Sequence, residues 1–165
     1  GIDNFMGSQI NFDLLTFSLK QNVRIGINDV LKYSFRSGKF INNKTLFAQD
    51  YKFFSSNNQE LTLSNPDEQF YLPGYYELFS KDYFIEGHIK FDLDKFLIKR
   101  LPVINGSLIR EKLTVNYLTT ESISNYMEIA YSLEDIFLMF DVGFTVGFKN
   151  FKDSTTGIRL SINLN

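Results

Sequence analysis

Apolar and polar residues alternate with a period of two along several stretches of this chain. The first stretch lies between residues 15 and 27, and its apolar members are Leu15, Phe17, Leu19, Val23, Ile25 and Ile27. In a β-strand, successive side chains point to opposite faces of the sheet. A helix would spread the same residues around its circumference. The alternation therefore predicts strands with one apolar and one polar face.

The same pattern recurs in enough places to predict an all-β chain of six to eight antiparallel strands. The remaining alternating stretches cover residues 30–40, 83–93, 108–117, 140–148 and 158–164, with a shorter candidate at 125–131. Asn28 and Asp29 are typical turn residues and predict that the first two strands form a hairpin. The parity of the apolar residues changes near Leu14 and Leu15, which predicts a bulge or a short turn there. Residues 75–80 and 96–100 are each expected to form one helical turn.

Residues 41–68 lack the alternation and predict a long loop within a single domain that covers residues 1–165. This stretch is rich in Asn and Ser and also carries the aromatic residues Phe47, Tyr51, Phe53 and Phe54. Loops of this length are uncommon in compact domains and usually have a function. Two readings stay open: the aromatic residues pack the loop against itself, or they contact a partner or the mouth of a barrel.

Composition argues against most catalytic and cofactor-dependent functions. The chain has no Cys and a single His, which leaves no thiolate zinc site and no Cys nucleophile. His88 has no obvious catalytic partner in the sequence, and the acidic pairs Asp92/Asp94 and Glu134/Asp135 lie beside predicted turns. We therefore expect no enzymatic activity, no catalytic or metal site and no cofactor. Seventeen basic and 19 acidic residues are spread along the chain, so nucleic acid is not an expected partner.

Strands with one apolar and one polar face fit two architectures, which differ in the face that points inward. In a transmembrane barrel the apolar face contacts lipid and the polar face lines the lumen. In a soluble β-barrel the apolar face surrounds a small apolar ligand, which requires Phe17, Phe91, Phe144 and Leu160 to point inward. Small polar residues and both signs of charge on the polar face favour the membrane reading. That reading predicts lumen-facing polar side chains at Lys20, Arg24, Lys32, Arg36, Glu86, His88, Lys90, Lys112, Asp141 and Arg159.

Several motifs in the second half of the chain resemble a known family. The segments 75–83, 87–88 and 95–102 (YYELFSKDY, GH and KFLIKRLP) are similar, in this order, to segments of the DUF5686 outer-membrane proteins of Bacteroidetes. Residues 109–111, 132–137 and 156–161 (IRE, SLEDIF and TGIRLS) extend the resemblance, whereas Gly87-His88 replaces a pair of His residues.

The resemblance implies the C-terminal part of an outer-membrane protein with an N-terminal carboxypeptidase-regulatory-like domain. The expected fold is an antiparallel up-and-down transmembrane β-barrel distantly like the Omp85 barrels, or the C-terminal six to eight strands of a larger one. The expected location is the bacterial outer membrane, and the expected partners are its lipid and further barrel strands or other outer-membrane proteins. A structural, transport or complex-forming role follows, and an export signal and periplasmic domain are expected to precede this chain.

Overall fold

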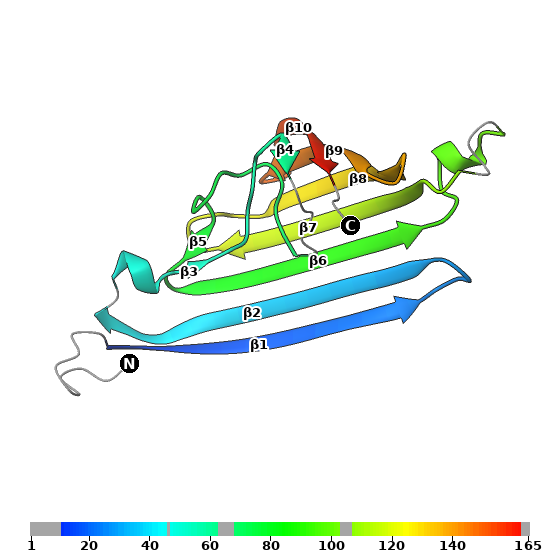
Figure 1. Ribbon diagram of the computed structural model, residues 1–165. Coiled ribbons are helices and arrows are strands. Elements are labelled where there is room, and N and C mark those ends of the chain that lie inside the picture. Colours follow the sequence, from blue (N-terminus) through cyan, green and yellow to red (C-terminus); the bar gives the residue numbers. More distant parts are fainter. Residues whose placement is uncertain (1–10, 46, 63–67, 103–106, 163–165) are drawn as a thin grey trace.

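One curved antiparallel sheet forms most of the protein in the computed structural model, which describes residues 11–45, 47–62, 68–102 and 107–162 (Figure 1). The strand order is β1-β2-β6-β7-β8-β9-β10-β4. The long strands are β1 (Asn11–Arg24), β2 (Val30–Thr45), β6 (Tyr83–Leu93), β7 (Arg110–Thr120), β8 (Tyr126–Ile136), β9 (Phe140–Lys149) and β10 (Asp153–Ile162). The short elements are η2 (Ala48–Asp50), β3 (Lys52–Phe53), β4 (Leu61–Thr62), β5 (Phe79–Ser80) and η3 (Ile98–Arg100).

The predicted all-β, antiparallel class is confirmed. The described ranges contain no α-helix, and they hold no helix of sufficient length and apolarity to cross a membrane. Consecutive long strands pair as antiparallel neighbours, whereas the two-residue contact of β10 with β4 and the isolated bridge of Ser56 with Phe70 are parallel. β1 lies at one edge and β4 at the other, so the described residues form an open sheet and not a closed barrel.

The local predictions agree with the structure at most positions. β1 and β2 form the predicted hairpin, with register shifts between Asn11 and Leu14. Its turn is closed by the Ile25 N–H, which donates to the Asp29 carbonyl at 3.0 Å. β2 continues to Thr45, into the stretch where the alternation is lost, and β8 extends well past residue 131. Residues 96–100 include the 3₁₀ turn η3, but the helical turn predicted at 75–80 is wrong, because residues 75–78 form a non-helical turn and Phe79–Ser80 form β5.

The two faces of the sheet have the opposite polarity from those of an ordinary soluble protein. We call the concave face, which carries Ser34, His88, Asn116 and Glu128 in one cross-strand row, the inner face. All four of these polar residues are buried. The adjacent row belongs to the outer face and carries Tyr33, Ile89, Val115, Ile129 and Val146. Polar side chains are thus buried, and large apolar ones are exposed.

Individual residues show the same inversion clearly. Glu86 on the inner face is 1% exposed, whereas Phe144 on the outer face is 49% exposed. A small apolar cluster does form on the inner side, from Phe54, Phe70, Leu78, Phe84 and Leu118. Three of its five members come from the connection between β2 and β6, so the cluster attaches this connection to the sheet.

Position 38 of β2 has no room for a side chain, because a buried aromatic ring lies close to Gly38. It lies opposite Phe84 of β6, and a Cβ at Gly38 would meet the Phe84 ring and come within 3.1 Å of the Leu15 carbonyl oxygen. We expect Gly38→Ala to lower the free energy of unfolding by about 1–3 kcal/mol, because a buried aromatic ring must shift. Urea unfolding of the folded protein measures this change. Gly143→Ala is the control, since its Cβ would lie 3.5 Å from Ser132 Cβ, and equal losses in both variants would contradict the prediction.

Candidate functional site

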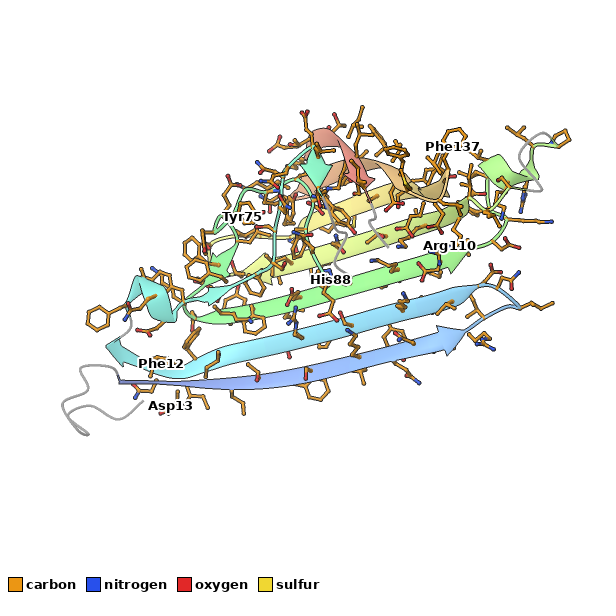
Figure 2. All side chains as sticks on the ribbon, in the orientation of Figure 1. Phe12, Asp13, Tyr75, His88, Arg110 and Phe137 are labelled. Atoms are coloured by element: carbon orange, nitrogen blue, oxygen red, sulfur yellow. The ribbon has the colours of Figure 1, made fainter. Side chains whose placement is uncertain are left out.

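The connection between β2 and β6 crosses the inner face of the sheet, and we call its described residues, 47–62 and 68–80, the inner segment (Figures 1 and 2). Phe54 packs edge-on against Phe84 with ring centroids 5.2 Å apart. Phe70 is fully buried, 5.1 Å from the His88 ring and 5.9 Å from the Tyr126 ring. These contacts place the inner segment on the polar face and account for the burial of the polar side chains there.

Glu128 of β8 is the main polar attachment of the inner segment. Its carboxylate accepts the N–H groups of Tyr71 at 2.8 Å and Leu72 at 2.9 Å. It also accepts the Tyr126 hydroxyl at 2.7 Å and Nδ2 of Asn116 at 3.2 Å. A fully buried carboxylate is stable only when such donors replace water, and here four donors surround it.

Arg159 of β10 holds the same part of the inner segment from the other side. Its guanidinium donates to the Asn57 carbonyl and, at 3.4 Å, to the Tyr71 carbonyl. The guanidinium carbon lies 4.5 Å from the centre of the Tyr71 ring, a distance typical of a cation–π contact. Glu128 and Arg159 therefore bind the N–H and C=O sides of the same short stretch of backbone.

His88 lies beneath the inner segment with both ring nitrogens facing oxygen atoms. Nδ1 is 2.8 Å from Asn116 Oδ1, and Nε2 is 3.0 Å from Glu86 Oε1. The orientation of the Asn116 amide is fixed, because its Nδ2 donates to the Gln69 carbonyl at 2.9 Å and to Glu128. The Glu86 carboxylate also accepts a hydrogen bond from Arg36 at 3.0 Å. The imidazole is thus engaged at both nitrogens, as expected of a connecting residue in a polar network.

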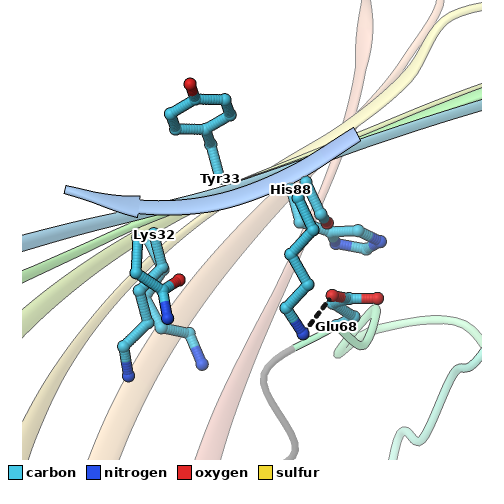
Figure 3. A pocket seen from close by; sticks show the side chains of 8 residues that line it. Lys32, Tyr33, Glu68 and His88 are labelled. Atoms are coloured by element: carbon cyan, nitrogen blue, oxygen red, sulfur yellow. Dashed lines mark ion pairs between the residues drawn. The ribbon is translucent and has the colours of Figure 1, made fainter. Parts of the chain in front are cut away.

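Ion pairs continue across the inner face on both sides of His88. Lys20 pairs with Glu68 at 2.8 Å, and Figure 3 shows this contact in a pocket beside His88. Tyr33 points to the opposite side of β2 in the same view. Lys32 pairs with Asp92 at 3.0 Å. Lys112 pairs with Glu134 and lies 3.8 Å from Asp92.

The Glu68 carboxyl illustrates the electrostatics of these pairs. The hydrogen bond from Lys20 lowers the pKa of Glu68 below its ordinary value of 4.5, and the charge of Arg36 lowers it further. Partial burial acts in the opposite direction. The net shift favours the ionised form that Lys20 binds.

Acidic side chains are numerous on this face, but they do not form a metal centre. Across the described ranges, no group of three His, Cys, Asp or Glu side chains is arranged to hold a metal ion. The carboxylates instead accept hydrogen bonds from backbone N–H groups and pair with lysine and arginine.

Residues 1–133 match the family model described as "Family of unknown function (DUF5686) C-terminal domain". The chain belongs to the DUF5686 family. The matched range includes the inner segment and Glu128 and ends within β8, so β9, β10 and the motif at 156–161 lie beyond it. No curated protein and no solved structure shows a significant match.

In this DUF5686 C-terminal domain, the polar residues selected from the sequence fall on one side of the sheet. The register places nine of them with the buried polar rows of the inner face: Lys20, Lys32, Arg36, Glu86, His88, Lys90, Lys112, Asp141 and Arg159. Asp141 there accepts the Asp135 N–H at 3.1 Å. Arg24 occupies a position of β1 that belongs to the same face as Lys20. It is exposed at the last position of the strand, away from the inner segment.

Sequence reasoning missed Glu128 and Asn116, which bind the inner segment together with the predicted Arg159. Both occupy polar positions between apolar neighbours, as Glu128 does between Met127 and Ile129. An acidic residue at a polar position near the middle of a strand was an available signal. The aromatic residues of the predicted loop pack within the protein: Phe54 contacts the sheet, while Tyr51, Phe53 and Phe79 pack on one another.

Replacing Glu128 should release the inner segment from the sheet. We expect Glu128→Ala to cost at least about 3 kcal/mol, because several buried donors lose their acceptor and each unsatisfied donor costs about 1–3 kcal/mol. Hydrogen exchange measures the effect directly: the Tyr71 and Leu72 amides should lose protection while β6 and β7 amides keep theirs. Glu60→Ala, at an exposed position of the same segment, should leave both amides protected. Unchanged protection in Glu128→Ala would show that the carboxylate does not hold the segment.

The Lys20–Glu68 pair should make part of the stability depend on pH. A carboxyl whose pKa is lower in the folded state stabilises that state above its unfolded pKa, and this contribution disappears as pH falls through the folded value. The unfolding midpoint of Glu68→Gln should therefore lie below that of the unchanged protein at pH 7, and the gap should shrink below pH 4.5. The pair is partly exposed, so the effect should stay under about 1 kcal/mol. Lys20→Met should show the same trend, and a gap that widens in acid would contradict the assignment.

Proposed function

We propose that this DUF5686 C-terminal domain is part of an antiparallel up-and-down transmembrane β-barrel in the bacterial outer membrane. Its role would be structural, transport-related or complex-forming rather than enzymatic. The observation that carries the proposal is the inverted polarity of the sheet, with polar side chains buried under the inner segment and Phe, Ile, Leu and Val exposed outside. Such an outer face is unfavourable in water but is what a lipid-exposed surface requires.

Strand length supports the same proposal. The seven long strands contain 10–16 residues each, and a tilted strand needs about 9–11 residues to cross the hydrocarbon core. Neighbouring strands pair in register over most of this length. Their backbone N–H and C=O groups therefore satisfy one another, as they must in lipid.

The edges of the sheet indicate what kind of partner the domain needs. β1 has β2 on one side and forms the edge of the sheet with the other. Lipid cannot satisfy a row of unpaired backbone groups, so a membrane location requires further strands beside β1. These would come from another part of the same barrel or from another outer-membrane protein.

The inner segment makes a structural or complex-forming role more suitable than that of an open pore. Phe70 fills space above His88, and Glu128 and Arg159 fix the backbone of Tyr71 and Leu72 across the polar face. Passage of a solute along this face would require the segment to move away from both side chains.

The alternative, a soluble barrel that binds a small apolar ligand, requires the apolar face to surround a cavity. Phe17, Phe144 and Leu160 are instead each about half-exposed on the outer face. This favours lipid over an enclosed ligand as the partner of that face.

The absence of Trp allows a direct test with single-Trp variants. Phe144→Trp reports on the outer face, and Tyr126→Trp, which replaces a ring that packs on Phe70, reports on the inner face. After reconstitution into bilayers, lipids brominated on the acyl chains should strongly quench Phe144→Trp and leave Tyr126→Trp nearly unaffected. Both variants must first give the far-ultraviolet dichroism of the unchanged protein. Equal quenching of the two, or none at Phe144→Trp, would overturn the proposed orientation.

A further inference from the structure

The connection between β6 and β7 forms a compact flap at one end of the sheet. We define the flap as Asp94–Leu101, which includes η3 and follows β6 directly. It lies at the end where Arg110 begins β7, opposite the end from which the inner segment leaves β2 (Figures 1 and 2). Residues 95–101 of the flap belong to the motif at 95–102 that resembles the DUF5686 family. Among the described residues, contacts with the inner segment do not account for this motif.

The carboxylate of Glu111 holds the flap in place, from a position of β7 that belongs to the outer face. Glu111 pairs with Leu93 and Leu133 across the sheet and shares its parity with Leu113 and Val115. Its side chain is fully buried. The carboxylate accepts four successive backbone N–H groups, from Phe96 at 3.0 Å, Leu97 at 2.7 Å, Ile98 at 3.2 Å and Lys99 at 2.9 Å. The Tyr131 hydroxyl donates a fifth hydrogen bond at 2.5 Å.

A second set of contacts ties the flap to the neighbouring turn. Lys99 Nζ lies 2.7 Å from Asp94 Oδ1, and the Asp94 N–H donates to Asp29 Oδ1 at 2.8 Å. Asn28 Nδ2 donates to Asp94 Oδ2 at 3.3 Å. Asp29 and Asp94 thus hold the flap to the β1–β2 turn.

The flap nevertheless presents apolar side chains outward. Leu97 is 55% exposed, and Leu101 is exposed to a similar extent. The β8–β9 turn at the same end presents Phe137, which is 87% exposed, and Leu138. Both turn residues have positive φ, 51° and 66°, a conformation that costs a bulky residue about 1–2 kcal/mol. Burying these exposed tips in an apolar environment would offset such a cost.

Basic side chains accompany the apolar ones. Lys95 and Arg100 are exposed on the flap, and its only acidic residue, Asp94, is paired with Lys99. The flap therefore offers an apolar tip beside two outward positive charges, on a backbone that Glu111 keeps rigid. This combination complements a lipid–water boundary that carries negative headgroups.

We propose that the flap anchors this end of the sheet at the membrane surface, where Lys95 and Arg100 bind the phosphates of anionic lipid headgroups. Leu97 and Leu101 then enter the outermost part of the acyl region, beside Phe137 and Leu138. This inference rests on the membrane location proposed above and adds a specific lipid partner and a residue-level contact.

Single-Trp quenching tests the inference in nanodiscs that contain equal amounts of phosphatidylglycerol and phosphatidylcholine, with only one of the two brominated. Leu97→Trp should be quenched, and more strongly by brominated phosphatidylglycerol, because each basic residue near the surface favours anionic lipid about fivefold. Adding Lys95→Gln and Arg100→Gln should abolish this preference. Lys152→Gln, in the turn at the other end of the sheet, should preserve it.

The outcomes separate this inference from the membrane location itself. Quenching at Phe144→Trp without quenching at Leu97→Trp would overturn the flap anchor and leave the transmembrane orientation intact. Equal quenching of Leu97→Trp by the two brominated lipids would overturn the role of Lys95 and Arg100. If neither Trp is quenched, the transmembrane proposal fails first.

Discussion

Glutamates on or next to the strands hold the connections of this protein in place. Glu128 accepts the N–H groups of Tyr71 and Leu72, and Glu111 accepts four consecutive N–H groups of the flap. Glu121, just after β7, accepts the Lys81 N–H and the Ser80 hydroxyl, both at 2.8 Å. Burial alone would raise the pKa of Glu121, but these hydrogen bonds lower it below its ordinary value. Each carboxylate thus supplies acceptors to irregular backbone that no neighbouring strand can reach.

This arrangement explains how a polar face can be buried without an apolar core of ordinary size. The inner segment covers the polar rows, and most of the charges it covers meet a partner: Arg36 meets Glu86 and Lys112 meets Glu134. Most side chains of the outer face are large and apolar and need no such network, and Glu111 at one end of that face is covered by the flap. The polar inner face and the β2–β6 connection therefore depend on each other. Without the connection, the polar side chains of the inner face would be exposed.

The sequence predicted the structure best wherever apolar and polar residues alternate along a whole strand. It predicted the β1–β2 hairpin and the polarity of the faces, because alternation is a local property of the backbone. It did not predict the path of the inner segment (residues 47–62 and 68–80), which has no period and whose position depends on partners far away in the chain, such as Glu128 and Arg159. β8 was predicted to end at residue 131 but continues to Ile136, through a register shift between Leu133 and Ile136 that interrupts the regular alternation. Membership of the DUF5686 family, predicted from the motifs, is confirmed by the family match.

The pairing of β4 with β10 has a consequence for the order in which strands can be added to the sheet. Leu61 and Thr62 lie beside Leu160 and Ser161, and the Leu160 N–H donates to the Glu60 carbonyl at 2.6 Å. An incoming strand can extend β1 without breaking any contact of the sheet, but at this part of β10 it must first replace β4. In the proposed barrel β1 is therefore the freer edge for pairing, whereas β4 would have to leave Leu160 and Ser161 before another strand could pair with them. In this position β4 would also hinder edge-to-edge pairing of two copies of the sheet at this part of β10.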